Sequence, residues 1–193
     1  QISVAFAPLF QMLLAEGRTE QLQLWVERLL KWIAIGGVLA VFGAMLPARS
    51  LIPWMLGAKF TQVYLNLIPL TVSLLTLALT NACRLLALTY DRPETALKAA
   101  IVQIAAFWGL GSMLVVEGGS LAGCSAVLIA SALQAGYFVW KTRCLLAFSL
   151  RGWFSAVATG ALFLPLVWLA ESLLTQTLLY ALFLLGYGVA LLT

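Results

Sequence analysis

Apolar residues along the chain fall into seven runs separated by short polar, glycine-containing or proline-containing segments. The runs cover residues 1–14, 29–46, 64–89, 96–116, 121–140, 153–170 and 173–192. Because a membrane-spanning helix needs about 20 mainly apolar residues, the last six runs predict full spans and the first a partial one. The runs lack the period-two alternation of barrel strands, and lipid offers no partner for open backbone groups. The predicted fold is therefore an all-α, polytopic transmembrane helix bundle of six full spans plus one truncated span.

The segments between the runs predict the domain organisation. Residues 1–14 form a truncated transmembrane helix, 15–140 the core of a transmembrane lobe with four spans, 141–151 a basic loop, and 152–193 two further spans. The chain begins inside an apolar run, so we expect it to be a fragment of a larger protein.

Three of the connecting segments carry specific expectations. Residues 16–27 form a polar connection with Gly17 as its breaker, and Pro47 closes the second run. Residues 49–60 are too short to span and contain Trp54, so a short amphipathic helix at the membrane interface is expected there. Residues 117–120, Glu-Gly-Gly-Ser, predict a tight turn between the fourth and fifth runs.

The composition is also typical of a membrane protein. Hydrophobic residues make up 63% of the 193 residues and charged ones 9%, whereas soluble domains carry about 45–50% and about 25%. This excludes a soluble enzyme, a disordered tail, a coiled coil and a disulfide scaffold. The chain has no histidine, and its 3 cysteines lack CxxC spacing. We therefore expect no catalytic residues, no metal site, no cofactor and no enzymatic activity.

The basic residues predict the orientation of the bundle. On one side, the loops and helix ends carry Arg18, Arg28, Lys31, Arg84, Arg92, Lys98, Lys141, Arg143 and Arg151. The other side carries Arg49 and Lys59. Because short basic loops stay in the cytoplasm, the first side is predicted to be cytoplasmic and the partial helix to run outside-to-inside. The net charge of +4 is thus explained by the predicted membrane topology, and no nucleic-acid partner is expected.

The third run, residues 64–89, contains the strongest candidate site. Polar residues recur at roughly helical spacing and form one stripe, with Asn81 at its edge: Asn66, Ser73, Thr76, Thr80 and Arg84. Polar groups inside a span are candidates for function, and such a stripe should face the bundle interior or a wet cavity. The alternative is that the hydroxyls bond to their own helix and that Arg84 extends to the cytoplasmic headgroups.

The fifth run has a weaker stripe made of Ser120, Cys124, Ser131, Gln134 and Lys141. Gly119 and Gly123 have GxxxG spacing, which favours close helix contact. The fourth run contains one mid-span amide, Gln103, and an amide in lipid more often bonds to a neighbouring helix than to a ligand.

The order and spacing of these features resemble a known family. A proline and a short Gly- and Glu-containing loop precede a span, a Pro–Gly–aromatic segment follows it, and a short cytoplasmic turn, a Gly turn and a basic cluster come later. The residues that carry the likeness are Pro8, Gly17, Glu20, 51–60 (LIPWMLGAKF), Asp91, Arg92, 118–123 (GGSLAG), Lys141 and Arg143. Together they are similar to the C-terminal half of the bacterial polysaccharide and O-antigen flippases, of the multidrug/oligosaccharidyl-lipid/polysaccharide (MATE-like) superfamily.

The resemblance implies one lobe of a two-lobe transporter in the bacterial inner membrane. Such a transporter moves lipid-linked oligosaccharide from the cytoplasmic to the periplasmic leaflet by alternating access, and holds the anionic headgroup in a cationic cavity. The implied partners are that substrate, membrane lipids and the missing N-terminal half. The candidate substrate-binding residues here are Arg84, Asn81, Thr80, Ser73 and Gln134. Arginine suits a diphosphate because its fork makes bidentate, charge-assisted bonds.

Three other functions are weighed against this one. A cation-coupled drug exporter of the same superfamily would need a buried carboxylate, and none lies deep in a predicted span. A polytopic enzyme of polysaccharide assembly would need a large periplasmic loop, and the longest here covers residues 47–60. A structural membrane subunit would bind no lipid headgroup. We expect no transport by this chain alone.

Overall fold

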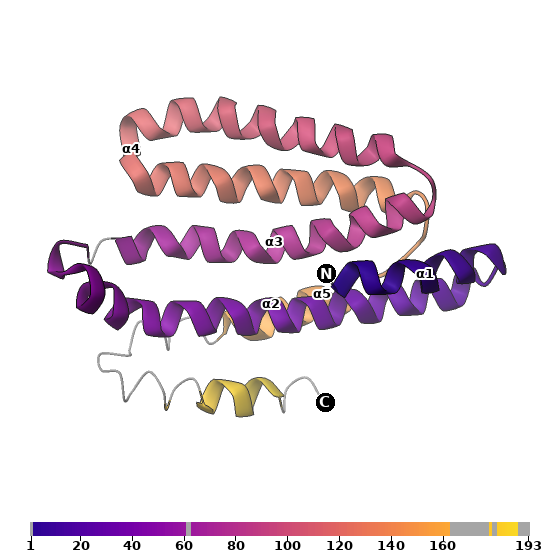
Figure 1. Cartoon of the computed structure of the whole chain (residues 1–193), viewed down its shortest axis with the longest axis horizontal. Coiled ribbons are helices and arrows are strands. Elements are labelled where there is room, and N and C mark those ends of the chain that lie inside the picture. The colour runs from indigo at the N-terminus through magenta and orange to yellow at the C-terminus, as the bar shows by residue number, and fades with distance from the viewer. Residues whose placement is uncertain (1, 61–62, 163–177, 179–180, 189–193) are drawn as a thin grey trace.

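The computed structural model describes residues 2–60, 63–162, 178 and 181–188 (Figure 1). The elements in order are α1 (Ile2–Ala15), α2 (Thr19–Leu56), the short 3-10 helix η1 (Ala58–Phe60), α3 (Val63–Thr89), α4 (Pro93–Arg143) and α5 (Arg151–Ala161). Residues 181–188 are also helical. No strand occurs within these ranges, which confirms the all-α class for the described part of the chain.

Among the described residues, four stretches of helix are long and apolar enough to cross a membrane: Thr19–Ala48, Val63–Thr89, Pro93–Val116 and Gly118–Arg143. They match the second to fifth apolar runs, and four such helices are compatible with a multi-pass membrane protein. The sixth and seventh runs lie largely outside the described residues, although α5 occupies the start of the sixth.

The fourth and fifth runs are the two halves of α4, which folds back on itself as a helical hairpin. Gly119 breaks it with φ 62° and ψ −146°, a conformation that a residue with a Cβ rarely adopts. The two halves return side by side, as Figure 1 shows. A Cβ added at Gly123 would lie 3.2 Å from Val115 Cγ2 across the hairpin. The close contact expected from the GxxxG spacing is therefore present at Gly123, whereas Gly119 forms the turn.

Helix α2 is longer than the sequence pattern predicts. The polar segment 16–27 is helical from Thr19 onwards, and only Gly17, with φ 70°, belongs to the turn after α1. Pro47 does not end the helix, which continues through Pro53 to Leu56. Each proline removes one backbone bond and bends a helix, and the ribbon changes direction here (Figure 1). The separate interfacial helix predicted over 49–60 is thus the end of α2 followed by η1.

The basic loop is shorter than the predicted range 141–151, because α4 continues to Arg143 and α5 begins at Arg151. The backbone of this loop is hydrogen-bonded to α2. The Ser149 N–H donates to Glu27 Oε1 at 2.7 Å, and Gln23 Nε2 donates to the same oxygen at 3.2 Å. The carboxylate of α2 therefore fixes the direction in which the chain leaves α4.

Three connections lie at one end of the bundle: α1 to α2, α3 to α4, and α4 to α5 (Figure 1). The opposite end holds the α2–α3 connection and the break in α4. The nine basic residues predicted to lie on one side belong to the helix ends and connections at the first of these two ends. We call it the basic end.

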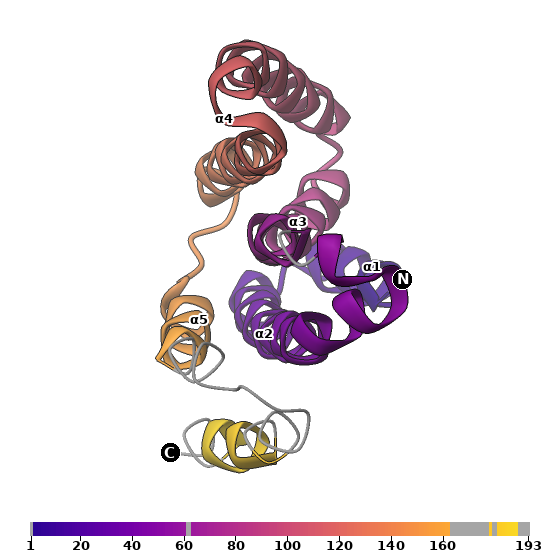
Figure 2. The ribbon, with the colours of Figure 1, turned by 90° about the vertical axis from the view of Figure 1, so that its left-hand side faces the viewer.

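Small residues let α5 pack closely on α2, beside which it lies in Figure 2. Gly152, Ala156 and Gly160 follow each other at intervals of one helical turn, and Ala156 is fully buried. A Cβ at Gly160 would lie 2.4 Å from Val38 Cγ1, and one at Gly152 would lie 3.5 Å from Lys31 Cβ. The seam is a small-xxx-small contact of the kind that brings membrane helices together.

We expect Gly160→Ala to lower the stability of the protein by about 1–3 kcal/mol, because the added methyl group overlaps Val38. Thermal unfolding of the detergent-solubilised protein measures this. Gly136→Ala is the matched control, because no atom lies within 4 Å of the added Cβ. Adding Val38→Ala to Gly160→Ala should restore most of the loss, and a double variant as unstable as the single one would contradict the close contact.

Candidate functional site

The polar stripe of α3 faces the second half of α4. Near the end opposite the basic end, Asn66 Nδ2 donates to Ser120 Oγ at 3.0 Å. In the middle of the span, the Thr76 hydroxyl donates to Ser131 Oγ at 2.8 Å. The two stripes predicted on the third and fifth runs therefore meet, and hydrogen bonds between helices match polar groups that lipid would leave without partners.

Nearer the basic end, α3 and α4 enclose a cavity instead of forming further polar pairs. Its volume is about 400 Å³, within the range of small-ligand sites. The polar lining comes from three helical segments, and the remaining lining is apolar. The polar lining residues are Thr80, Asn81, Arg84, Gln103 and Gln134. We call this the α3–α4 cavity.

The polar groups of this cavity lie at similar depth. Arg84 is five residues from the end of α3 at Thr89, Gln103 ten from the start of α4 at Pro93, and Gln134 nine from its end at Arg143. At a rise of 1.5 Å per residue, these positions lie about 7–15 Å from the ends of their helices. They form a polar layer inside the bundle, close to the basic end but below the connecting loops.

Two buried side chains in this layer carry polar groups toward the cavity. Thr80 is 5% exposed, and its hydroxyl has no hydrogen-bond partner among the described residues. Gln134 is 8% exposed and likewise has no bonded partner in the described part of the chain. Because a buried polar group without a partner costs about 1–3 kcal/mol, the Thr80 hydroxyl is retained at the expense of stability. Such groups are typical of ligand sites.

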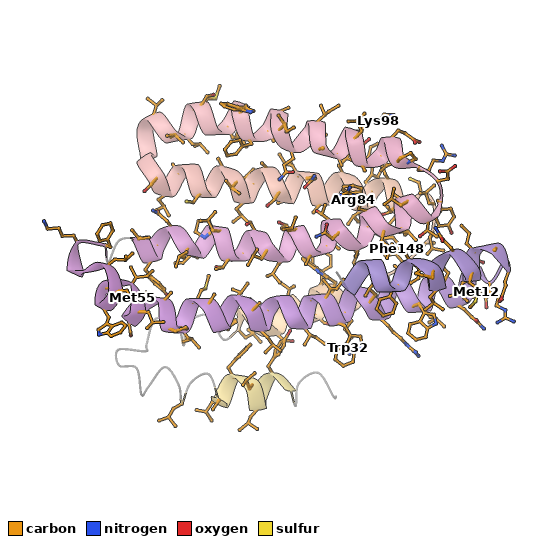
Figure 3. All side chains as sticks on the ribbon, in the orientation of Figure 1. Met12, Trp32, Met55, Arg84, Lys98 and Phe148 are labelled. Atoms are coloured by element: carbon orange, nitrogen blue, oxygen red, sulfur yellow. The ribbon has the colours of Figure 1, made fainter. Side chains whose placement is uncertain are left out.

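The cation of the layer is exposed. Arg84 lies on the last turns of α3 (Figure 3), and within the described ranges no carboxylate pairs with it. The nearby acid Glu94 is 3.7 Å from Arg92 instead. The guanidinium therefore has its donors available for an anion in the cavity.

Ser73, the fifth residue predicted for the site, does not line the cavity. Its hydroxyl donates to the Leu70 carbonyl of its own helix at 2.6 Å. Thr71 and Thr89 also bond to carbonyls one turn earlier. For these hydroxyls the alternative of bonding within the helix holds. Thr80, Asn81, Arg84 and Gln134 are the predicted residues that the fold brings together.

The sequence predicts that Gln103 bonds to a neighbouring helix. Instead its side chain lines the cavity, and none of the described residues is a hydrogen-bond partner for it. The spacing within one helix does not place Gln103 next to α3, because that depends on the hairpin at Gly119. Its depth, ten residues from the start of α4 and close to the nine residues that separate Gln134 from the end, is the signal in the sequence that points to it.

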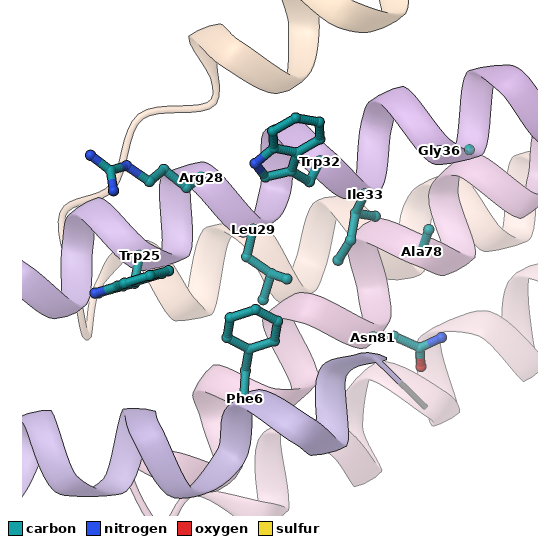
Figure 4. Close-up of a pocket in the computed structure, with 10 residues that line it drawn as sticks. Phe6, Trp25, Arg28, Leu29, Trp32, Ile33, Gly36, Ala78 and Asn81 are labelled. Atoms are coloured by element: carbon teal, nitrogen blue, oxygen red, sulfur yellow. The ribbon is translucent and has the colours of Figure 1, made fainter.

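A second cavity lies on the other side of α3, between α1, α2 and α3 (Figure 4). Its volume is about 680 Å³. Asn81 lines both cavities, and Arg28 is the charged residue of this one. The lining residues are Phe6, Trp25, Arg28, Leu29, Trp32, Ile33, Gly36, Gly37, Ala78 and Asn81. The sequence pattern does not predict this cavity, because it indicates a connection over residues 16–27, where α2 in fact begins at Thr19.

The groups that line the α3–α4 cavity are suited to binding a ligand. One cation, three amides and one hydroxyl can donate hydrogen bonds to an anion, and none of the described lining residues is a carboxylate. Among the described residues, no group of three or more His, Cys, Asp or Glu could hold a metal ion.

Comparison of the chain with models of protein families, with curated proteins and with solved structures finds no match. Function therefore has to be inferred from the residues of the cavity and their surroundings.

Thr80 and Thr76 should respond in opposite ways to removal of the hydroxyl. Thr80→Val should keep or raise stability, because it removes a buried group without a partner. Thr76→Val should lower it by about 0.6 kcal/mol, a typical value for a hydrogen bond between membrane helices.

Thermal unfolding of both variants in the same detergent tests this. If Thr80→Val destabilised the protein as much as Thr76→Val, the Thr80 hydroxyl would have a structural partner and would not be free for a ligand.

Proposed function

We propose that the chain is part of an inner-membrane transporter that moves a lipid-linked oligosaccharide from the cytoplasmic to the periplasmic leaflet by alternating access. In this proposal it forms one MATE-like lobe, with six full spans and one partial span. The α3–α4 cavity holds the anionic diphosphate headgroup. The observation that carries the proposal is an unpaired Arg84 beside Thr80 and Gln134, which are buried without bonded partners among the described residues.

The chemistry of the lining favours an anionic headgroup over a cationic drug. A guanidinium makes bidentate bonds to phosphate oxygens, and the amides of Asn81 and Gln134 can donate to the same group or to sugar hydroxyls. A cation-coupled exporter needs a carboxylate at its site, and the part of the lining that the structure describes contains none. A headgroup of this kind also explains why a costly arginine is placed inside a span.

The depth of the cavity favours loading from the cytoplasmic side. By the distribution of basic residues, the basic end faces the cytoplasm. The polar layer about 7–15 Å inside that end is within reach of a headgroup in the cytoplasmic leaflet. The lipid tail of the substrate would remain in the bilayer during entry.

Arg84→Gln, introduced into the chromosomal gene, should lower export of the polysaccharide at least tenfold. The physical reason is the loss of charge-assisted hydrogen bonds to the headgroup, worth about 1.5–3 kcal/mol. Export by Arg84→Lys should fall between that of the wild type and that of Arg84→Gln, because lysine keeps the charge and loses the planar fork. The readouts are surface polysaccharide and the amount of lipid-linked oligosaccharide retained in the cytoplasmic leaflet.

Arg143→Gln is the matched control, because Arg143 is exposed at the end of α4 and does not line the cavity. It removes one positive charge from the same end and should leave export unchanged. Normal export by Arg84→Gln, at wild-type protein levels in the membrane, would exclude the proposed role of Arg84.

A further inference from the structure

The residues that α2 contributes to the cavity between α1, α2 and α3 form a cationic end and an apolar end (Figure 4). Arg28 lies toward the basic end of α2, and Gly36 lies eight residues farther along the helix. At 1.5 Å per residue, the two positions are about 12 Å apart along the axis. Between them the lining from α2 is Leu29, Trp32 and Ile33. Along α2 the lining therefore changes from cationic to apolar with increasing depth in the span, while α3 contributes Ala78 and the amide of Asn81.

The cationic end has the features of a headgroup site. The Arg28 guanidinium carbon lies 5.8 Å from the centre of the Trp25 ring, and no described carboxylate pairs with Arg28. Trp32 is 69% exposed beside it. Tryptophan at the level of lipid headgroups is typical of membrane proteins, because its ring is apolar and its N–H is polar.

The apolar end is open because of a glycine. A Cβ added at Gly36 would meet no atom within 4 Å, so this position faces free space. Its neighbour Gly37 differs, because a Cβ there would lie 2.6 Å from Leu75 Cδ2 on α3. Gly37 thus allows α2 and α3 to pack closely, whereas Gly36 leaves room for a ligand.

We propose that this cavity binds an anionic glycerophospholipid of the surrounding membrane, with the phosphate at Arg28 and an acyl chain running along α2 toward Gly36. The single unpaired cation at one end selects a negative headgroup, and the lining beyond it, apolar except for the amide of Asn81, matches a hydrocarbon chain. A soluble anion or a free sugar would leave that lining unmatched. The site is separate from the α3–α4 cavity and does not rest on the proposed transport.

Native mass spectrometry of the detergent-solubilised protein tests the proposal, with phosphatidylglycerol and phosphatidylcholine of identical acyl chains added separately. The wild-type protein should retain phosphatidylglycerol at least tenfold better. Arg28→Gln should bring the ratio close to one. Gly36→Leu should reduce retention of both lipids at least tenfold, because its side chain fills the apolar end.

Gly136→Leu is the matched control. Gly136 is also helical and has free space at its Cβ, but it lines neither cavity. It should retain phosphatidylglycerol as the wild-type protein does. Helical circular dichroism and monomeric elution show that each variant is folded, and Arg28→Gln decides the question if Gly36→Leu is not.

Three results would overturn the proposal. The first is equal retention of the two lipids by the wild-type protein. The second is a folded Gly36→Leu variant that retains phosphatidylglycerol as Gly136→Leu does. The third is displacement of the bound phospholipid by polyprenyl diphosphate in the wild type and in Arg84→Gln alike, which would assign this cavity to the transported substrate.

Discussion

Polar side chains in a membrane-spanning helix have to be matched by other protein groups, and in this chain the polar side of α3 determines how α4 packs. Lipid has no donors or acceptors for Asn66 and Thr76, and Ser120 and Ser131 of the returning half of α4 supply partners, with the Ser73 carbonyl as a second acceptor for Thr76. The hairpin at Gly119 makes this return possible. Once these two pairs are formed, the remaining polar groups of both helices come together near the basic end around a cavity.

Individual glycines decide where two helices pack closely and where space between helices stays open. Gly160 and Gly37 bring α5 and α3 against α2, where any added methyl group would overlap a neighbouring side chain. Gly36, one residue away from Gly37, faces open space instead. The result is a bundle that is tight along some helix seams and hollow on both sides of α3, with Asn81 lining both hollows.

The sequence predicts the α-helical class and the helices of the second to fifth runs well, because continuous apolar runs have few alternatives in lipid. It predicts Thr80, Asn81, Arg84 and Gln134 as neighbours because helical spacing aligns each stripe on its own helix. It does not predict that α2 continues through Pro47, because proline bends a helix as readily as it ends one. Ser73 bonds within its own helix and Gln103 lines the cavity, contrary to both predictions, because the packing of α4 against α3 decides which residues face the cavity.

Direct binding of a polyprenyl diphosphate to the purified protein is the measurement that tests the role of the α3–α4 cavity most closely. Isothermal titration calorimetry in detergent compares the wild-type protein with Arg84→Gln, and Arg143→Gln serves as the control. Loss of a charge-assisted bond worth about 1.5–3 kcal/mol should weaken binding roughly 10- to 100-fold in Arg84→Gln. Arg143→Gln should bind as the wild-type protein does. Equal affinity of the wild type and Arg84→Gln would show that the headgroup, if bound, is held elsewhere.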